Sequence, residues 1–207
     1  MSEFKLPTEV VELPSKGYLY SEESGLSSGK VEMKYMTAKE EDILTNQSYI
    51  SKGIVLDKLM KSLIVSKIQY DDLLVGDKNA IMVAARILGY GAEYSFTYLG
   101  EDQIVDLSKL ENKEIDEKLY KSGTNSFDYT LPHSKNKITF KILSNKDEKA
   151  IQRELDGLKK INKDNVPELT TRLKHMITSV EGKSEPKDIR SFVDNYLLAK
   201  DSRAFRE

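Results

Sequence analysis

The stretch "GDKNAIMVAARILGYG", residues 76–91, is the clearest structural signal in the sequence. Asp77 is a preferred helix-capping residue, "AIMVAARIL" is apolar almost all round, and two glycines end the pattern. A helix that is apolar all round is normally buried. We therefore expect this segment to be the central helix of the first half of the chain. Its one interior charge, Arg86, is expected to pair with a carboxylate such as Asp77 or Asp57.

The segments before this helix predict one strand and further helices. Residues 1–29 are interrupted by proline and glycine and indicate an irregular start, whereas "KVEMKYM" (30–36) alternates like a strand with one exposed face. Thr37 then precedes "AKEEDIL", and Glu40 three residues later completes a capping box that starts a helix. Apolar residues recur at helical spacing through "GIVLDKLMKSLIVSKI" (53–68), so this segment is expected to turn one face to the core.

Two β-hairpins are predicted after the central helix. Residues 93–107, "EYSFTYLGEDQIVDL", alternate on both sides of "GED", and residues 127–143, "FDYTLPHSKNKITFKIL", repeat this plan around a polar turn. From Ser144 the pattern is helical to the end of the chain, in three segments with narrow apolar stripes. Such stripes are typical of helices that pack on another part of the chain or on a partner.

These patterns define an α+β fold class, in which helices with small antiparallel hairpins are followed by a helical C-terminal part. The length of 207 residues allows one large domain or two small ones. We expect a mixed domain over residues 1–143, with a hairpin subregion at about 93–143, and a helical region over residues 144–207.

Composition excludes several classes of protein. The chain has 32 basic and 34 acidic residues, without the concentrated basic face of a nucleic-acid binder. With no cysteine it forms neither disulfides nor thiolate metal sites, and His133 and His175 are too few and too far apart for a histidine zinc site. No apolar run reaches the roughly 20 residues of a membrane span. The N-terminus has no signal-peptide pattern, so we expect a cytoplasmic protein.

No catalytic or nucleotide-binding motif emerges. "SGLSSGK" (24–30) lacks the spacing of a P-loop, and "GYGA" (89–92) ends a helix, whereas a dinucleotide fingerprint opens one. Acidic clusters such as "KEEDI" (39–43) fit solvated helix starts. We therefore expect no enzyme, no cofactor, no metal and no small-molecule substrate. An enzyme that uses His133 or His175 with a neighbouring carboxylate is kept as an alternative.

The stretch "LPSKGYLY", residues 13–20, carries two tyrosines in a segment without helical or strand periodicity. It either becomes ordered on a partner, a role that suits tyrosine, or lies over the edge of the first sheet through Leu13, Tyr18 and Leu19. The last helical segments offer further aromatic and basic side chains. The candidate interaction residues are Tyr18, Tyr20, Phe192, Tyr196, Arg203 and Phe205.

A nucleic-acid-binding accessory protein is the second reading of the sequence. "YSFTY" (94–98) has the pattern of a base-stacking strand, and "KKINK" (159–163) is a small basic spot. However, an alternating aromatic strand more often contributes to a core, and the nearly balanced charge disfavours phosphate binding. We therefore expect no bound nucleic acid.

Several blocks, read in order, resemble a known family. The resemblance covers nearly the whole chain, and the ordered set is more specific than any single block. The blocks "LPSKGYLY", "GKVEMKYMTAKEEDILTN", "LLVGDKNAIMVAARILGYGAEY", "VDLSKLENKEI", "FDYTLPHSKNKITFKIL" and "SRAFRE" are together similar to the baseplate hub assembly protein family of T-even-type bacteriophages.

The resemblance implies a non-enzymatic role in tail morphogenesis of contractile-tailed phages, as a hub component or as an assembly chaperone that helps the hub polymerise. The implied partners are other baseplate hub and tail assembly proteins. The implied location is the cytoplasm of the infected bacterial host, or the virion tail baseplate. Some members of the wider family carry a cysteine pair in a hairpin that resembles a zinc ribbon. The matching tip here, "YLGEDQ" (98–103), has no cysteine, so no zinc role carries over. The hairpin then depends on its strands alone, which favours a flexible appendage.

Overall fold

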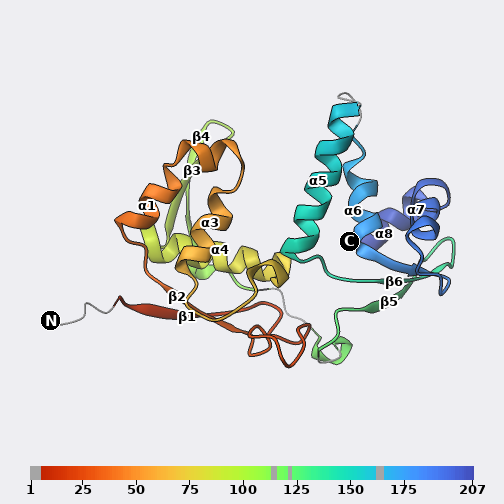
Figure 1. Ribbon diagram of the computed structural model, residues 1–207, viewed down its shortest axis with the longest axis horizontal. Coiled ribbons are helices and arrows are strands. Elements are labelled where there is room, and N and C mark those ends of the chain that lie inside the picture. The colour runs from red at the N-terminus through yellow and green to blue at the C-terminus, as the bar shows by residue number, and fades with distance from the viewer. Residues whose placement is uncertain (1–5, 113–115, 121–122, 162–165) are drawn as a thin grey trace. The chain divides into compact units, whose positions relative to one another are not determined.

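The chain has the predicted α+β class, with helices and three small antiparallel sheets of two or three strands (Figure 1). The computed structural model describes residues 6–112, 116–120, 123–161 and 166–207. The chain divides into two units: unit 1 spans residues 1–70 and 76–124, and unit 2 spans residues 71–75 and 125–207.

Unit 1 combines two two-stranded sheets with four helices. Its elements are β1 (Thr8–Glu12), β2 (Lys30–Lys34), α1 (Ala38–Leu44), α2 (Gln47–Ser51), α3 (Val55–Leu63), α4 (Val75–Tyr90), β3 (Glu93–Tyr98) and β4 (Glu101–Asp106). Strand β1 falls in the part that the sequence predicted to be irregular. It pairs antiparallel with β2, with Val11 opposite Val31. The strand was not predicted, because proline and glycine residues are frequent in this part of the sequence.

The alternation in β2 and the helical stripe in α3 are confirmed. Val31 and Met33 of β2 are buried while their neighbours are not, and α3 buries Leu59, Met60 and Leu63. The amide of Val65, just after α3, donates to the carbonyl of Glu32, so the chain returns from α3 to the side of β2. The sequence periods therefore identified the core of unit 1 correctly.

The capping box of α1 is confirmed, but its acid is not solvated as the sequence reading of "KEEDI" assumed. Glu40 Oε2 accepts from Thr37 N at 2.9 Å and from Thr37 Oγ1 at 2.6 Å, and Glu40 is wholly buried. Its other oxygen accepts from Lys34 Nζ at 2.8 Å and from Ser62 Oγ at 2.7 Å. Burial alone would raise the pKa of Glu40, but these hydrogen bonds together lower it to about 2.

The stretch "LPSKGYLY" is ordered within unit 1. Leu13 is buried and its amide donates to the carbonyl of Gly29 at 2.8 Å. Gly17 has a positive φ of 83°, and a Cβ there would lie 2.3 Å from the carbonyl oxygen of Ser27, so only glycine fits. Tyr20 is also buried. The segment is therefore held down by this chain, as the second of the two sequence readings proposed.

The carboxylate of Asp77 is the anchor of this stretch. It accepts from Ser15 N at 2.9 Å, from Ser15 Oγ at 2.7 Å and from Tyr20 Oη at 2.5 Å. The sequence predicted Asp77 as a helix cap, and a carboxylate such as Asp77 or Asp57 as the partner of Arg86; both predictions were wrong. Helix α4 begins two residues earlier, and Arg86 donates instead to the carbonyls of Gly91 and Glu93, at 2.9 and 3.3 Å.

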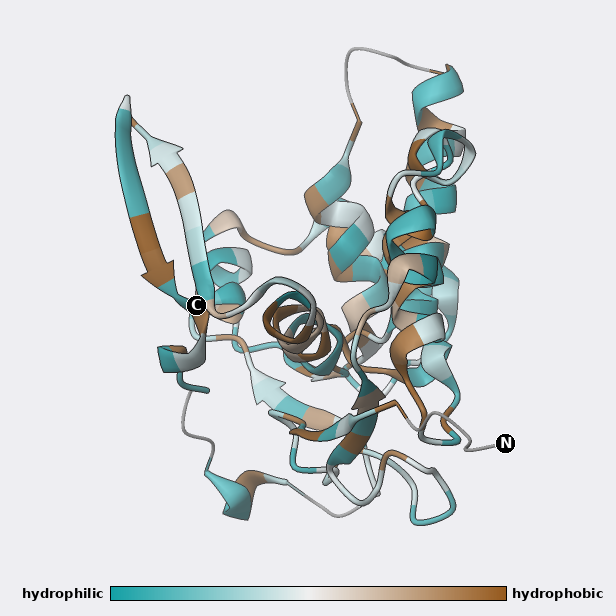
Figure 2. Ribbon diagram, turned by 90° about the vertical axis from the view of Figure 1, so that its left-hand side faces the viewer, coloured by the Kyte–Doolittle hydropathy of each residue, from teal (hydrophilic) through white to brown (hydrophobic). Residues whose placement is uncertain are grey.

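Helix α4 matches its predicted range, but unit 1 covers only one side of it. Ile81 and Ala85 are its buried apolar residues, and the other apolar positions are partly exposed. In Figure 2, where α4 is seen end-on near the centre, hydrophobic colour surrounds most of the helix. An apolar helix with one uncovered side departs from the expectation of a central, fully buried helix.

Unit 2 combines a three-stranded sheet with four helices. Its elements are β5 (Phe127–Thr130), β6 (Lys137–Phe140), α5 (Asn145–Ile161), α6 (Glu168–Met176), β7 (Ile177–Val180), α7 (Pro186–Asn195) and α8 (Ala199–Arg206). Strand β7 was missed, because "ITSV" continues the apolar spacing of the helix before it. Since β6 pairs with both β5 and β7, the second hairpin belongs with the C-terminal helices, and the units divide at residue 124 rather than at 143.

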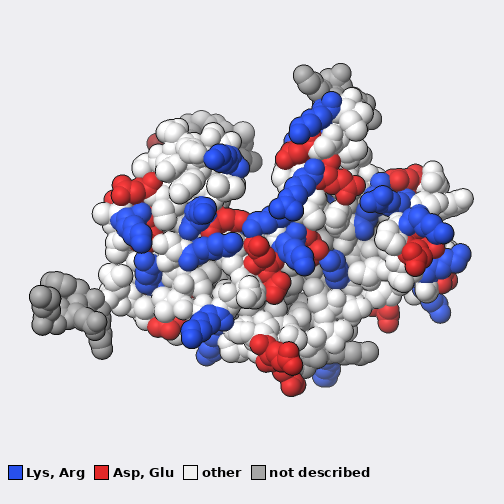
Figure 3. Space-filling view, viewed as in Figure 1, with Lys and Arg blue, Asp and Glu red and all other residues white. Residues whose placement is uncertain are grey.

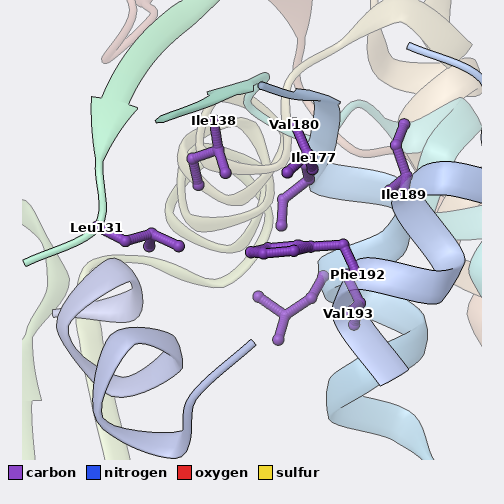
Figure 4. Packing of buried hydrophobic residues seen from close by; sticks show 8 residues of the cluster. Leu131, Ile138, Ile177, Val180, Ile189, Phe192 and Val193 are labelled. Carbon is purple, nitrogen blue, oxygen red and sulfur yellow. The ribbon is translucent and has the colours of Figure 1, made fainter. Parts of the chain in front are cut away.

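The core of unit 2 lies between this sheet and helices α6 and α7. Figure 4 shows Phe192 pointing from α7 toward Leu131, with Ile138 and Ile177 nearby. The buried residues of this cluster are Leu131, Ile138, Leu173, Ile177, Val180, Ile189, Phe192 and Val193. A second cluster joins Leu143 to Ile151 and Leu155 of α5.

Helix α8 is fixed to the β5–β6 turn by a buried carboxylate. Asp201 accepts from the backbone amides of His133 and Ser134, at 2.8 and 2.9 Å. Burial opposes ionisation, but hydrogen bonds from Ser134 and His133 hold the pKa of Asp201 below its ordinary value. The last helix of the chain is thus a structural part of unit 2.

Candidate functional site

The six sequence-predicted interaction residues do not form one surface. Tyr20 is buried against Asp77, and Phe192 is buried in the core of unit 2, so neither is presented to a partner. Phe205 packs edge-on against Phe140, with ring centroids 5.0 Å apart. These three aromatic side chains stabilise the fold of the chain itself.

The other three candidates remain at least partly accessible. Tyr18 is half-buried. Its side chain bonds to the Glu117 carboxyl, and hydrogen bonds from Lys16 and Tyr18 hold the pKa of that carboxyl below its ordinary value. Tyr196, at the end of α7, is 66% exposed. Arg203 is exposed and pairs with Glu207 at 2.7 Å. They lie on separate elements, and Tyr18 belongs to a different unit from the other two.

The hairpin formed by β3 and β4 is highly exposed along its whole length. No residue in either strand is buried. Figure 2 shows the pair as a ribbon that projects away from α4, and no third strand pairs with it. A two-stranded ribbon with both faces in water is marginally stable by itself. This element therefore contributes little to the core.

One face of the hairpin is aromatic. Because side chains alternate along a strand, Tyr94, Phe96 and Tyr98 share a face, and Val105 lies opposite Tyr94 on the same face. The rings of Tyr94 and Phe96 stack with centroids 5.9 Å apart. Tyr98 is 63% exposed. The sequence reading placed such an aromatic strand in a core, whereas here it faces solvent.

The base of the hairpin is held by Arg86 of α4. Its guanidinium carbon lies 5.2 Å from the ring centroid of Tyr90 and 5.7 Å from that of Tyr94. The same side chain donates to the carbonyls of Gly91 and Glu93, and the amide of Leu107 donates to the carbonyl of Ala92. The aromatic face is therefore oriented at its base while its tip is free.

The tip of the hairpin places a leucine in a conformation that leucine rarely adopts. Leu99 and Gly100 form the two-residue turn, and both have positive φ, at 52° and 86°. Asparagine or aspartate is preferred at the first of these positions. Leu99 is also 87% exposed. An apolar side chain in strained backbone at an exposed tip is unfavourable in the isolated chain, which points to a role in contact.

The charges of the hairpin are of one sign. Strand β3 contributes Glu93 and strand β4 contributes Glu101, Asp102 and Asp106, and neither strand has a lysine or arginine. Hydrogen bonds from Ser108, with a smaller effect of Lys109, hold the pKa of Asp106 below its ordinary value. The aromatic face is thus bordered by carboxylates, which favour a basic partner surface.

Other chemistry is sparse in the residues that the structure describes. His175 Nε2 lies 3.0 Å from Glu154 Oε2 between α6 and α5, and His133 lies in the β5–β6 turn, so the two histidines occupy different places. No group of three or more potential ligands among these residues is arranged to hold a metal ion. No described helix is both long and apolar enough to cross a membrane.

Comparison with known proteins gives no match, whether among family models, curated proteins or solved structures. The sequence predicted this hairpin and favoured an appendage at its tip, but it did not single out the aromatic face of β3 as a contact surface. A further signal of exposure lies in β4, where "EDQ" (101–103) puts three polar residues in a row at the start of a short strand. A core strand has no reason to carry them.

Proposed function

We propose that this chain is a baseplate hub assembly protein of a contractile-tailed bacteriophage, acting as hub component or assembly chaperone in the cytoplasm of the infected host. The ordered sequence blocks supply the family. The observation that carries the mode of action is the β3–β4 hairpin, in which no side chain is buried. The protein acts by contact with other hub and tail assembly proteins rather than by catalysis.

The physical basis is the cost of leaving such a hairpin uncovered. Tyrosine and phenylalanine bury large areas on binding with little loss of rotamer freedom, and they are enriched where interfaces gain most of their free energy. Tyr94, Phe96 and Tyr98 offer this area on one face, with an exposed leucine at the tip. An assembly factor needs a surface of this kind because its contacts must form late and be replaced.

Co-expression with the hub subunits of a T-even-type phage tests the proposal. The wild-type chain should change the solubility or the oligomeric state of at least one subunit, followed by size-exclusion chromatography. The double variant Phe96→Ser/Tyr98→Ser should lose this effect. The control Leu56→Ser/Leu169→Ser removes two exposed leucines, from α3 and α6, and should retain it. Hub subunits that behave identically with and without the wild-type chain would contradict the proposal.

A nucleic-acid-binding accessory protein is the second candidate, because the aromatic strand "YSFTY" does face solvent. Two observations weigh against it. The strands of the hairpin carry four carboxylates and no lysine or arginine. The basic residues Lys159 and Lys160 lie on α5, which belongs to the other unit. Acidic and basic side chains are also interspersed in the view of Figure 3. A gel shift at low salt that weakens as salt rises would favour this candidate, and its absence would remove it.

A further inference from the structure

Helix α4 has more apolar surface than unit 1 covers. Its buried side consists of Ile81 and Ala85, with Asp77 at its start. Seen along the helix axis, Ala80, Val83 and Ile87 lie about 100° to 160° from Ile81, since residues advance by about 100° each. These residues are only partly buried. A helix of this composition is expected to be covered on both sides, but none of the residues that the structure describes in unit 1 buries this side of α4.

The uncovered side of α4 forms the floor of a groove of about 410 Å³. The rest of its lining is mixed, with Val11, Glu12 and Pro14 from the start of the chain and Leu107, Ser108, Leu110, Glu111 and Asn112 after strand β4. Leu110 is 57% exposed, so the groove is open to solvent. An open groove with an apolar floor and a partly polar lining favours an amphipathic ligand.

Its shape fits a helix. The floor runs from Gly76 to Ile87, which is about 17 Å or three helical turns. Gly76, Ala80 and Ala84 recur every four residues on it, and such small side chains allow another helix to approach closely. Asn79 at the edge is the only polar side chain that the helix itself contributes to the groove. These features are typical of a groove that receives the apolar face of an amphipathic helix.

The charges around the groove define the polar face of that helix. Among its described lining residues the charged ones are Glu12 and Glu111. Glu12 shares its charge with Lys30 at 3.3 Å, whereas Glu111 is exposed in the segment after β4. Strands β3 and β4, which precede this segment in the chain, carry only carboxylates as charged groups. Charge complementarity therefore requires lysine or arginine beside the apolar face of the ligand.

We propose that the groove along α4 binds an amphipathic helix of a partner protein, with its apolar face on Ala80, Val83, Ala84 and Ile87 and its basic residues toward Glu12 and Glu111. The site does not depend on the phage role, because it follows from the composition and coverage of α4. It adds a second contact beside the aromatic hairpin and specifies the partner as a helix with basic flanks.

The test uses the full chain and two fluorescein-labelled peptides of about 15 residues. Both form an amphipathic helix of leucine and alanine, and one has lysine and the other glutamate on the polar face. Fluorescence anisotropy should show the lysine peptide binding about tenfold more tightly or better. Ala84→Arg should weaken its binding by about tenfold or more, because a long cationic side chain fills the floor. The control Leu56→Arg, on α3 and outside the groove, should leave binding unchanged.

A second variant guards against a folding defect in Ala84→Arg. The exchange Glu12→Lys/Glu111→Lys affects two exposed residues and should reverse the preference between the peptides. Lack of lysine-peptide binding to the wild-type chain, equal binding of both peptides, or binding that Ala84→Arg leaves intact would each overturn the proposal. A dimer that Ala84→Arg dissociates would overturn it in favour of a second copy of this chain. If the co-expression test with hub subunits fails, the proposed function is contradicted. The outcome of the peptide-binding test does not depend on that result.

Discussion

Hairpins β3–β4 and β5–β6 have similar sequences and opposite environments. Both alternate aromatic with polar residues, as "YSFTY" and "FDYT" show. In the second hairpin the rings of Phe127 and Phe140 stack 5.3 Å apart, and Phe205 of α8 packs edge-on against Phe140. In the first, no residue is buried. The difference teaches that alternation predicts a hairpin, while elements far along the chain decide whether it is covered.

The cover of β5–β6 comes from three remote sources. Strand β7 pairs with the free edge of β6, helix α7 brings Phe192 to the cluster, and helix α8 is fixed by Asp201 to the turn. Hairpin β3–β4 is held at its base by Arg86, and none of its described residues is buried. We interpret the missing cover as the place of a partner protein.

The largest effect on stability should come from replacing a buried isoleucine in hairpin β5–β6, compared with an exposed isoleucine in hairpin β3–β4. Ile138→Ala in β6 removes a side chain that is 2% exposed and should lower the free energy of unfolding by between about 2 and 5 kcal/mol. Ile104→Ala in β4, where the side chain is 70% exposed, should change it by less than about 0.5 kcal/mol. Urea denaturation measures both. Equal losses would show that the first hairpin is covered as well as the second.

Acid should weaken unit 1, which carries the exposed hairpin, through Glu40. Its pKa falls from 4.5 to about 2 on folding. The resulting stabilisation, about 3 kcal/mol, is complete above the unfolded pKa and is lost as the pH falls toward about 2. The variant Glu40→Gln should be less stable at neutral pH and should show a flatter decline below pH 4.5 than the wild-type chain, measured by thermal unfolding across that range. An unchanged pH profile would show that Glu40 is not held ionised by Lys34 and Thr37.

A smaller effect than that of Ile138 or Glu40 should come from the tip of the exposed hairpin. Leu99→Asn places a residue that tolerates positive φ in the turn and should stabilise the hairpin by about 1 kcal/mol. Hydrogen exchange of the β3–β4 amides should slow while global unfolding stays the same. The same variant should bind hub subunits more weakly, because it removes the apolar tip. A slower exchange together with unchanged binding would show that Leu99 has no part in contact.

Local patterns predicted the elements that depend on local sequence. The capping box of Thr37 and Glu40, the range of α4 and both hairpins are confirmed, since caps, periods and turns act over a few residues. The α+β class followed from their order. Strand β7 was missed because "ITSV" fits a helical stripe as well as a strand, and only its pairing with β6 decides between them.

The candidate site was harder to predict because exposure depends on the whole chain. Tyr20 and Phe192 were candidates as aromatic residues, yet Asp77 and the core of unit 2 bury them. An alternating strand such as Tyr94 and Phe96 was thought more typical of a core, yet the two side chains stay 43% and 38% exposed. Arg86 was expected to find a carboxylate and instead holds the hairpin base through backbone carbonyls. For Tyr20 and Phe192, the residues that bury the side chain lie far along the chain, beyond the reach of a local pattern.

Hydrogen exchange of the two hairpins, before and after addition of T-even-type hub subunits, tests the central claim most directly. The account predicts fast exchange of the β3–β4 amides in the free chain, marked slowing with the hub subunit that binds, and slow exchange of β5–β6 in both states. It would be contradicted by β3–β4 amides as protected as those of β5–β6 in the free chain, or by a hub complex in which their exchange is unchanged.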